Sequence, residues 1–208
     1  VKNIKDLAGS ENVNLKIKPK INIKANIDIP GDKSISHRAL IIGSLTNGKT
    51  KVKGLLEAED CLNTLKIMQS LGVNIEKKKN NEYHINGVGL KGLTEPNKVL
   101  NCGNSGTAMR LLTGLLSAQR FYSVLSGDNS LRERPMARII NPLTKMGTKI
   151  ISRKGGKAPL SIKGKGKTNA INYKLPVASA QVKSSLLLAA LYSNEKTVIK
   201  EPAISRDH

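Results

Sequence analysis

Three short stretches gather small, polar and basic residues just before an apolar segment. They read "PGDKSISHRA" at residues 30–39, "NCGNSGTAMR" at 101–110 and "VASAQVKSS" at 177–185. The start of a helix carries unpaired backbone N–H groups and a partial positive charge, so it attracts phosphates and carboxylates. The three stretches therefore predict helix starts that together bind an anionic ligand.

Side chains would strengthen such a site. Four of them are basic and can meet phosphate or carboxylate oxygens as a point charge or a planar fork, namely Lys33, Arg38, Arg110 and Arg134. Hydroxyl and amide groups that can bind a phosphate or a hydroxyl stand at Ser34, Ser179 and Gln181. Gly106 would let the backbone approach a ligand closely. The pattern matches neither a Walker P-loop nor a dinucleotide fingerprint.

Simpler roles compete with these. Ser34 and Ser36 could be helix caps only, and Arg134 could be an ordinary residue of a helical turn before a proline. His37 is better explained as a helix-surface residue or a satisfied hydrogen-bond partner than as a base, because no Ser/His/Asp arrangement surrounds it. The acids near the second stretch, Asp128 and Glu133, are expected to cap a helix start, and Cys61 and Cys102 to be small core residues.

Composition narrows the class of protein. The chain has 208 residues, 38% of them hydrophobic, so it can build a core, and its formal net charge is +20. The lysines are scattered rather than clustered, and only 2% of residues are aromatic, which argues against nucleic-acid binding but leaves a basic nucleic-acid-binding module as an alternative. We see no signal segment or membrane span, and we expect a cytoplasmic protein.

Helix-like and strand-like segments repeat along the chain. A helix over residues 36–45, a strand from Thr50, a helix over 59–72 capped by Asp60, and two strands form a first unit. The same order returns from Gly106, and Gly72 and Gly147 end the second helix of each unit, 75 residues apart. Helix 179–193 and strand 196–201 open a third unit. The alternating residues 12–29 lie outside the repeats and predict two short strands.

The segments "PGDKSISHRA", "GNSGTAMR", "RERPM" and "ASAQVKS" resemble, in order and spacing, the signatures of the 5-enolpyruvylshikimate-3-phosphate (EPSP) synthase family of enolpyruvyl transferases. The resemblance implies a mixed α/β (α+β) fold with βαβαββ repeats around a pseudo-threefold axis. This chain would form one lobe of a two-domain protein, with its third repeat truncated. Residues 1–29 would open the other, discontinuous domain, and residues 30–208 would form the N-terminal-half substrate-binding domain.

The resemblance also implies an activity and residue roles. The family transfers the enolpyruvyl group of phosphoenolpyruvate to the 5-hydroxyl of shikimate 3-phosphate and releases phosphate, without a metal or cofactor. Lys33 matches the lysine that meets both substrates. The other residues that match the shikimate 3-phosphate site are Ser34, Arg38, Ser179, Ala180, Gln181 and Arg206. Those that match the phosphoenolpyruvate site are Gly106, Arg134 and Gln181.

Other implications follow from the same likeness. The acid and base groups lie in a half of the protein that this chain lacks, so we expect no turnover by the chain alone, and we expect a monomer with no nucleic-acid or membrane partner. The nearest rival is the UDP-N-acetylglucosamine enolpyruvyl transferase, whose opening lysine is followed by asparagine, whereas Ser34 follows Lys33 here. The family is the target of glyphosate. Residues 179–181 resemble the tolerant class, yet Gly106 is retained where an alanine would block the inhibitor.

Overall fold

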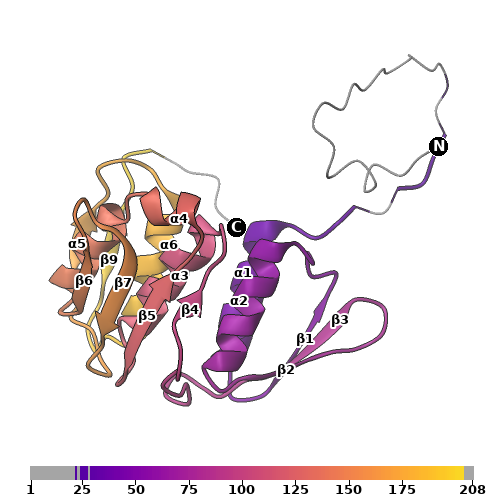
Figure 1. The fold of residues 1–208 in the computed structure, drawn as a ribbon, viewed down its shortest axis with the longest axis horizontal. Helices are drawn as coiled ribbons and strands as arrows, with labels where there is room; N and C mark the ends of the chain where they lie inside the picture. Colours follow the sequence, from indigo (N-terminus) through magenta and orange to yellow (C-terminus); the bar gives the residue numbers. More distant parts are fainter. Residues whose placement is uncertain (1–21, 23, 28, 204–208) are drawn as a thin grey trace.

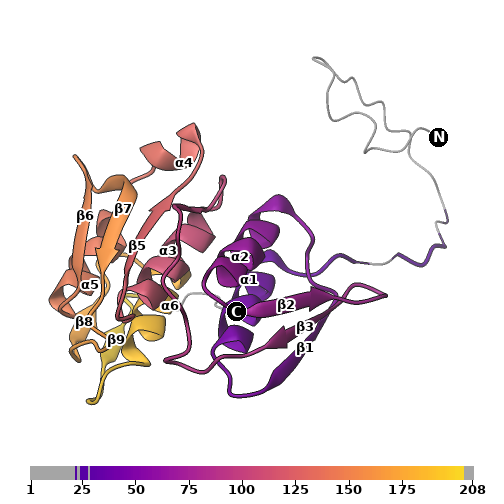
Figure 2. The ribbon, with the colours of Figure 1, turned by 60° about the horizontal axis from the view of Figure 1, so that its bottom comes forward.

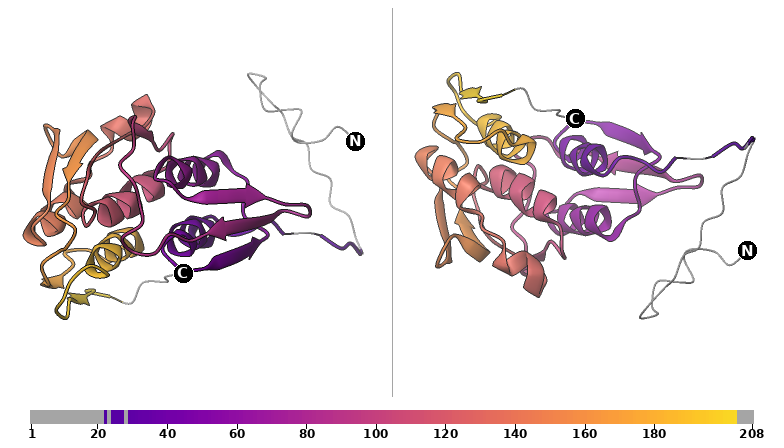
Figure 3. Two further views of the ribbon diagram at one scale, coloured as in Figure 1. Left: turned by 90° about the horizontal axis from the view of Figure 1, so that it is seen from below. Right: turned by 90° about the horizontal axis from the view of Figure 1, so that it is seen from above.

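Helices form the middle of the molecule and sheets form two outer sides in the computed structural model, which describes residues 22, 24–27 and 29–203 (Figure 1). Views along the helices show this layering most clearly (Figure 3). The predicted mixed α/β class is confirmed. None of the described helices is long and apolar enough to cross a membrane.

The first unit has the predicted order of elements. It contains α1 (Lys33–Ser44), β1 (Lys49–Lys53), α2 (Glu59–Ser70), β2 (Asn74–Lys77) and β3 (Glu82–Asn86). The three strands form an antiparallel sheet in the order β1-β3-β2. The helices α1 and α2 pack against each other and lie on the inner side of this sheet (Figure 2).

The second unit repeats this arrangement with two additions. Its elements are β4 (Leu100–Asn101), α3 (Gly106–Leu116), β5 (Tyr122–Ser126), α4 (Asn129–Glu133), α5 (Ala137–Lys145), β6 (Lys149–Arg153) and β7 (Lys157–Lys163). The sheet order is β4-β5-β7-β6, with β4 parallel to β5 and the other pairs antiparallel. The strands β5, β7 and β6 thus take the positions that β1, β3 and β2 hold in the first unit.

The third set of elements is shorter. It consists of β8 (Asn172–Lys174), α6 (Ala180–Ala190) and β9 (Val198–Lys200). The strands β8 and β9 pair in parallel, as β4 and β5 do in the second unit. The predicted helix and strand of a third copy therefore both form.

Matching glycines end the second helix of each complete unit. Gly72 follows α2 and Gly147 follows α5, and both have a φ angle of +90°. L-residues with a side chain rarely adopt this left-handed conformation, so glycine is the residue that lets the chain turn out of the helix and into the next strand.

Helix α3 lies at the centre of the core and contacts α1, α2, α5 and α6. Nine of its eleven residues are buried, including Leu111, Leu112, Leu115 and Leu116, which have no exposed surface. A helix that is apolar on all sides is stable only when other elements surround it. The core rests on aliphatic side chains, as the low aromatic content predicts.

Two details of α2 differ from prediction. Ala58 occupies the N-cap position, and Asp60 lies inside the first turn instead. The buried face is formed by Cys61, Thr64, Met68 and Leu71. A spacing of three residues predicts Leu62 and Leu65 on the same face as Met68 and Leu71, but these two leucines are half-buried at its edge. The carboxylate of Asp60 pairs with Lys33 on α1 instead of capping α2.

Three short elements were not predicted, namely β4, α4 and β8. Each has between two and five residues, which is too short to show a periodic apolar pattern. Most of the expected strands in residues 12–29 lie outside the described residues. The described residues among them, 22, 24–27 and 29, form no helix or strand.

Candidate functional site

The start of α1 is fixed by its cap. The backbone N–H of Ile35 donates a hydrogen bond of 2.8 Å to the carboxylate of Asp32, the N-cap residue. Lys33 is therefore the first residue of the helix. Its Nζ lies 3.0 Å from Oδ2 of Asp60, and 52% of its side chain is exposed. The Lys33 ammonium group is thus held at the N-terminal end of α1, where it stays accessible to a ligand.

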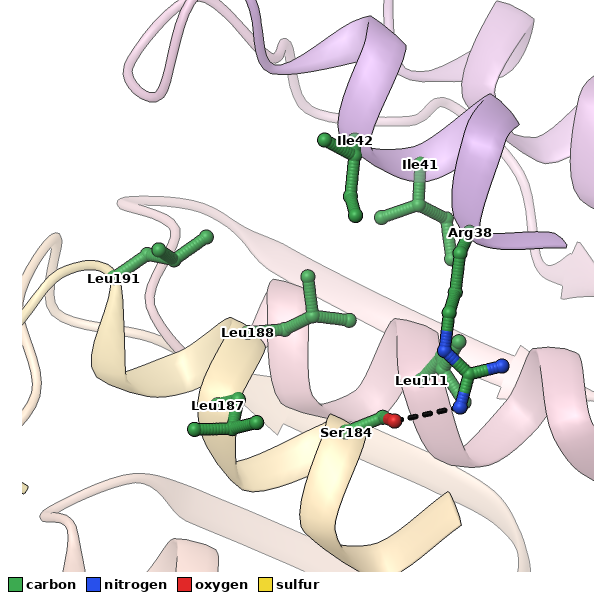
Figure 4. Close-up of a pocket in the computed structure, with 8 residues that line it drawn as sticks. All are labelled: Arg38, Ile41, Ile42, Leu111, Ser184, Leu187, Leu188 and Leu191. Atoms are coloured by element: carbon green, nitrogen blue, oxygen red, sulfur yellow. Dashed lines mark hydrogen bonds between the residues drawn. The ribbon is translucent and has the colours of Figure 1, made fainter. Parts of the chain in front are cut away.

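Arg38 lies one helical turn after Ser34 and joins two helices. Its guanidinium group donates to the Ser34 carbonyl at 3.1 Å and to Ser184 Oγ of α6 at 2.7 Å (Figure 4). Burial lowers the pKa of Arg38, and the charge of Asp32 opposes that shift. A guanidinium group that has lost part of its hydration gains more than an exposed one when an anion binds.

The start of α3 brings two further arginines together. Ser105 caps the helix by accepting from the Ala108 N–H at 3.1 Å, so Gly106 is its first residue. A Cβ atom on Gly106 would lie 2.6 Å from a guanidinium nitrogen of Arg110 and 3.4 Å from one of Arg134. The absence of a side chain at Gly106 therefore leaves room for both guanidinium groups beside the helix start.

Arg134 is held by the loop before α3. It donates to the backbone carbonyl of Asn104 at 3.2 Å and to the side-chain carbonyl of the same residue. The Asn104 amide in turn donates to the Asp128 carboxylate at 2.6 Å. These bonds attach both ends of α4 to the loop before α3.

The two candidate acids of this region have structural contacts. Asp128 caps α4, as predicted, by accepting from the Leu131 N–H at 2.7 Å. The hydrogen bond from Asn104 and those from the backbone lower the pKa of its carboxyl group. Glu133 does not cap a helix start, contrary to prediction. It is the last residue of α4 and pairs with Arg153 and Lys157, because the β6–β7 hairpin brings those two cations beside it.

Positive charge accumulates around Arg110. Burial lowers the pKa of this guanidinium group most, and the charges of Arg134 and Arg138 lower it further. Like charges repel, so such a cluster is stabilised by an anion placed between them. This is a local field that the net charge of the chain alone does not reveal.

The start of α6 faces the start of α3. Ser179 is the N-cap and accepts from the Val182 N–H at 3.4 Å, which makes Ala180 the first helical residue. The side-chain amide of Gln181 donates to Thr107 Oγ1 at 2.9 Å. The third stretch of small and polar residues therefore lies against the second one.

His37, Cys61 and Cys102 are buried, which excludes a helix-surface position for His37. The His37 ring is fully buried between Thr64 and Ser105, and burial lowers its pKa to about 4. Cys61 and Cys102 are buried and free, in agreement with their prediction as core residues. Burial raises the pKa of both thiols, that of Cys61 to about 11.

All predicted site residues except Arg206, which lies outside the described residues, stand at or beside the starts of α1, α3 and α6. Ser184, Thr107 and Asn104 join the site without having been assigned a role from the sequence. Ser184 could have been found, since it lies one helical turn after Ala180 and so on the same side of α6. Thr107 and Asn104 gave no signal, because only tertiary packing places them opposite a partner.

An apolar groove of about 330 Å³ leads away from Arg38 between α1 and α6 (Figure 4). Its floor and walls are formed by Ile41, Ile42, Leu111, Leu187, Leu188 and Leu191. About half of the surface of Ile42, Leu187 and Leu191 is exposed.

Within the described part of the chain, no group of three or more His, Cys, Asp or Glu residues is arranged to hold a metal ion.

Comparison with known proteins gives one family. Residues 17–208 match the family model of EPSP synthase (3-phosphoshikimate 1-carboxyvinyltransferase). The chain is 54% identical over 195 residues to the 3-phosphoshikimate 1-carboxyvinyltransferase of Petrotoga mobilis, an alignment that covers 93% of this chain and 45% of that protein. It is 55% identical over 192 residues to the enzyme of the same name from Ruthia magnifica, with 92% and 44% covered.

A solved structure agrees. The EPSP synthase of Acinetobacter baumannii matches with a TM-score of 0.84 and 50% identity, over 87% of this chain and 41% of that one. The chain thus spans less than half the length of the relatives it matches. Sequence and fold agree over nearly all of its own length, and the chain belongs to the EPSP synthase family.

Proposed function

We propose that this chain is the N-terminal half of a 3-phosphoshikimate 1-carboxyvinyltransferase. The whole protein would transfer the enolpyruvyl group of phosphoenolpyruvate to the 5-hydroxyl of shikimate 3-phosphate and release phosphate. The observation that carries this proposal is the convergence of three helix starts with the basic side chains of Lys33, Arg38, Arg110 and Arg134. Such an arrangement suits two small phosphorylated ligands that lie side by side.

The proposed roles divide between the two substrates. Shikimate 3-phosphate would be held by Lys33, Ser34, Arg38, Ser179, Ala180, Gln181 and Arg206. Phosphoenolpyruvate would meet Lys33, Gly106, Arg134 and Gln181. Lys33 and Gln181 belong to both sets, so they would align the reacting groups.

Charge neutralisation is the main contribution of this half. Two anionic substrates repel each other, and a basic surface that has lost part of its water can hold them at reacting distance. Protonation of the enol carbon and deprotonation of the hydroxyl also require acid and base groups. We place those groups in the other half of the protein. The chain alone would bind substrate without turnover.

The packing of the helices indicates how the domain is completed. Helix α2 packs against both α1 and α3, and α5 packs against both α3 and α6. A third helix in the same relation would pack against α6 and α1, where the apolar groove lies. We assign this groove to the second helix of the third βαβαββ unit, from the chain that follows residue 208. Residues 1–29 would belong to the other domain, and the whole protein would be a cytoplasmic monomer.

The rival functions have less support. The family model that matches residues 17–208 is described as EPSP synthase, which favours the proposed function over that of the enzyme that acts on a nucleotide sugar. A nucleic-acid-binding role rests on net charge alone. Affinity for RNA that falls steeply with salt, combined with no affinity for shikimate 3-phosphate, would favour it.

Phosphate release by the complete protein tests the function. With both substrates present, we expect the complete protein to release phosphate and the 208-residue chain to release none. A Lys33→Ala variant of the complete protein should lose about a hundredfold in kcat/KM. Lys154→Ala, which removes an exposed lysine in the β6–β7 turn, is the matched control. Equal rates for the two variants would refute the role of Lys33, and absence of phosphate release by the complete protein would refute the function.

A further inference from the structure

Three side-chain hydrogen bonds join the starts of the inner helices in pairs. Arg38 links α1 to α6 through Ser184, and Gln181 links α6 to α3 through Thr107. His37 links α3 to α1, because its Nε2 lies 3.4 Å from Oγ of Ser105, the N-cap residue of α3. The three helix starts are therefore joined in a closed ring.

The links differ in what a ligand can do to them. Arg38 and Gln181 are half-buried and belong to the proposed substrate contacts, so a phosphate or hydroxyl can compete for them. The His37 link is inaccessible, since His37 has no exposed surface and its partner Ser105 is only 2% exposed. A ligand can exchange the first two links and leaves the third intact.

Each hydrogen bond around His37 can be given one donor and one acceptor. Ser105 Oγ already accepts from the Ala108 N–H, so its own proton is available for His37 Nε2. The Nδ1–H of His37 then donates to Thr64 Oγ1 at 2.8 Å, and the Thr64 hydroxyl reaches the Asp60 carbonyl at 3.5 Å. This arrangement needs a neutral imidazole. Burial favours that form by lowering the pKa of His37. The charge of Asp60 opposes this shift, and those of Lys33 and Arg38 add to it.

We infer that His37 is a positioning residue for the substrate site. Its imidazole ties the N-cap of α3 to α1 and so fixes Gly106 relative to Lys33 and Arg38, both before and after a ligand displaces the other two links. The inference rests on the proposed function for the identity of the ligand and on the described contacts for the geometry.

Three variants of the 208-residue chain separate this role from general stability. His37→Leu removes both ring bonds. His37→Gln keeps a polar group at the distance of Nε2 and can still reach Ser105. Thr64→Val removes the bond within the first unit and leaves the bond to α3, so it is the matched control. The measurement is the affinity for shikimate 3-phosphate by calorimetry, with the free energy of unfolding recorded for each variant.

We expect His37→Leu to weaken binding about tenfold, His37→Gln to stay within about threefold of wild type, and Thr64→Val to bind like wild type even where it unfolds more easily. Unchanged affinity in His37→Leu would overturn the inference. So would a loss in Thr64→Val as large as that in His37→Leu, because the effect would then follow stability.

A second measurement needs no ligand and separates this inference from the proposed function. We expect the amide hydrogens of Ala108 and Met109 to exchange about fivefold faster in His37→Leu than in Thr64→Val, because the N-cap of α3 has lost its support. Equal exchange in the two variants would overturn the inference. If the wild-type chain binds no shikimate 3-phosphate, but exchange is still faster in His37→Leu than in Thr64→Val, only the proposed half-site is refuted.

Discussion

Arg38 of α1 and Ser184 of α6 lie 146 positions apart in the sequence and are joined by a hydrogen bond of 2.7 Å. The bond connects the first and third units of the chain at the edge of the apolar groove. Arg38 also keeps a bond to the Ser34 carbonyl of its own helix. The guanidinium group can therefore exchange Ser184 for an anion without losing all of its partners.

Ser184→Ala tests this exchange. Loss of one partly buried hydrogen bond should lower the free energy of unfolding by about 1 kcal/mol. Affinity for shikimate 3-phosphate should stay within about twofold of wild type, because Arg38 has given up this bond in the complex. Calorimetry and urea unfolding on the same samples measure both quantities. A loss of affinity comparable to that of Arg38→Ala would show that Ser184 itself holds the ligand.

Asp60→Asn tests the restraint on Lys33. The Lys33–Asp60 pair is half-exposed, so removing its charge should change the free energy of unfolding by less than about 1 kcal/mol. Affinity for inorganic phosphate should rise about threefold, because a negative charge beside the site is lost. Glu76→Gln, which removes an exposed carboxylate paired with Lys78, is the control and should change neither quantity. Weaker phosphate binding in Asp60→Asn would contradict the account.

His37 predicts a dependence of stability on pH. Its pKa falls from 6.5 in the unfolded chain to about 4 in the folded one. The unfolded state therefore binds the proton more readily, so this contribution to stability is complete above pH 6.5 and is lost as the pH falls toward 4. The loss between pH 7 and pH 5 should be about 2 kcal/mol.

Urea unfolding of wild type and His37→Gln at several pH values provides the check. The charged groups that act on His37 are Asp60, Lys33 and Arg38, and all three are present in both proteins. The difference between the two stability curves thus isolates the imidazole. Parallel curves between pH 7 and pH 5 would mean that His37 does not stay neutral in the folded chain.

Leu187→Asp tests the assignment of the groove. Leu187 is 50% exposed in this chain, so the substitution should change its free energy of unfolding by about 0.5 kcal/mol or less. In the complete protein, where we expect a helix to cover the groove, the same substitution should cost about 3 kcal/mol. Ile151→Asp, on a strand residue that is 60% exposed, should cost the same in both proteins. If Leu187→Asp lowers the free energy of unfolding equally in the two proteins, no helix covers the groove in the complete protein.

The sequence was most informative where a pattern repeats. Gly72 and Gly147 marked equivalent helix ends, and the apolar periodicity placed the long helices, because both features depend on local backbone and burial preferences. The roles of residues that depend on tertiary contacts were harder to predict from the sequence. Asp60 has the side chain of a cap, yet it pairs with Lys33 on another helix.

The site follows the same division. The stretches around Lys33, Gly106 and Gln181 could be identified because helix starts with glycine, serine and basic residues have a direct electrostatic meaning. The hydrogen bonds between the three starts could not, since they join residues as far apart as Arg38 and Ser184. Only the packing of α3 against α1 and α6 brings these partners together.

Calorimetric titration of the 208-residue chain with shikimate 3-phosphate is the most direct test of the central claim, that the three helix starts form a substrate half-site. We predict saturable binding by wild type, loss of that binding in Arg38→Ala, and unchanged binding in Arg120→Ala, which removes an exposed arginine beyond the C-terminal end of α3. Absence of binding by the folded wild-type chain, or equal binding by the two variants, would contradict it.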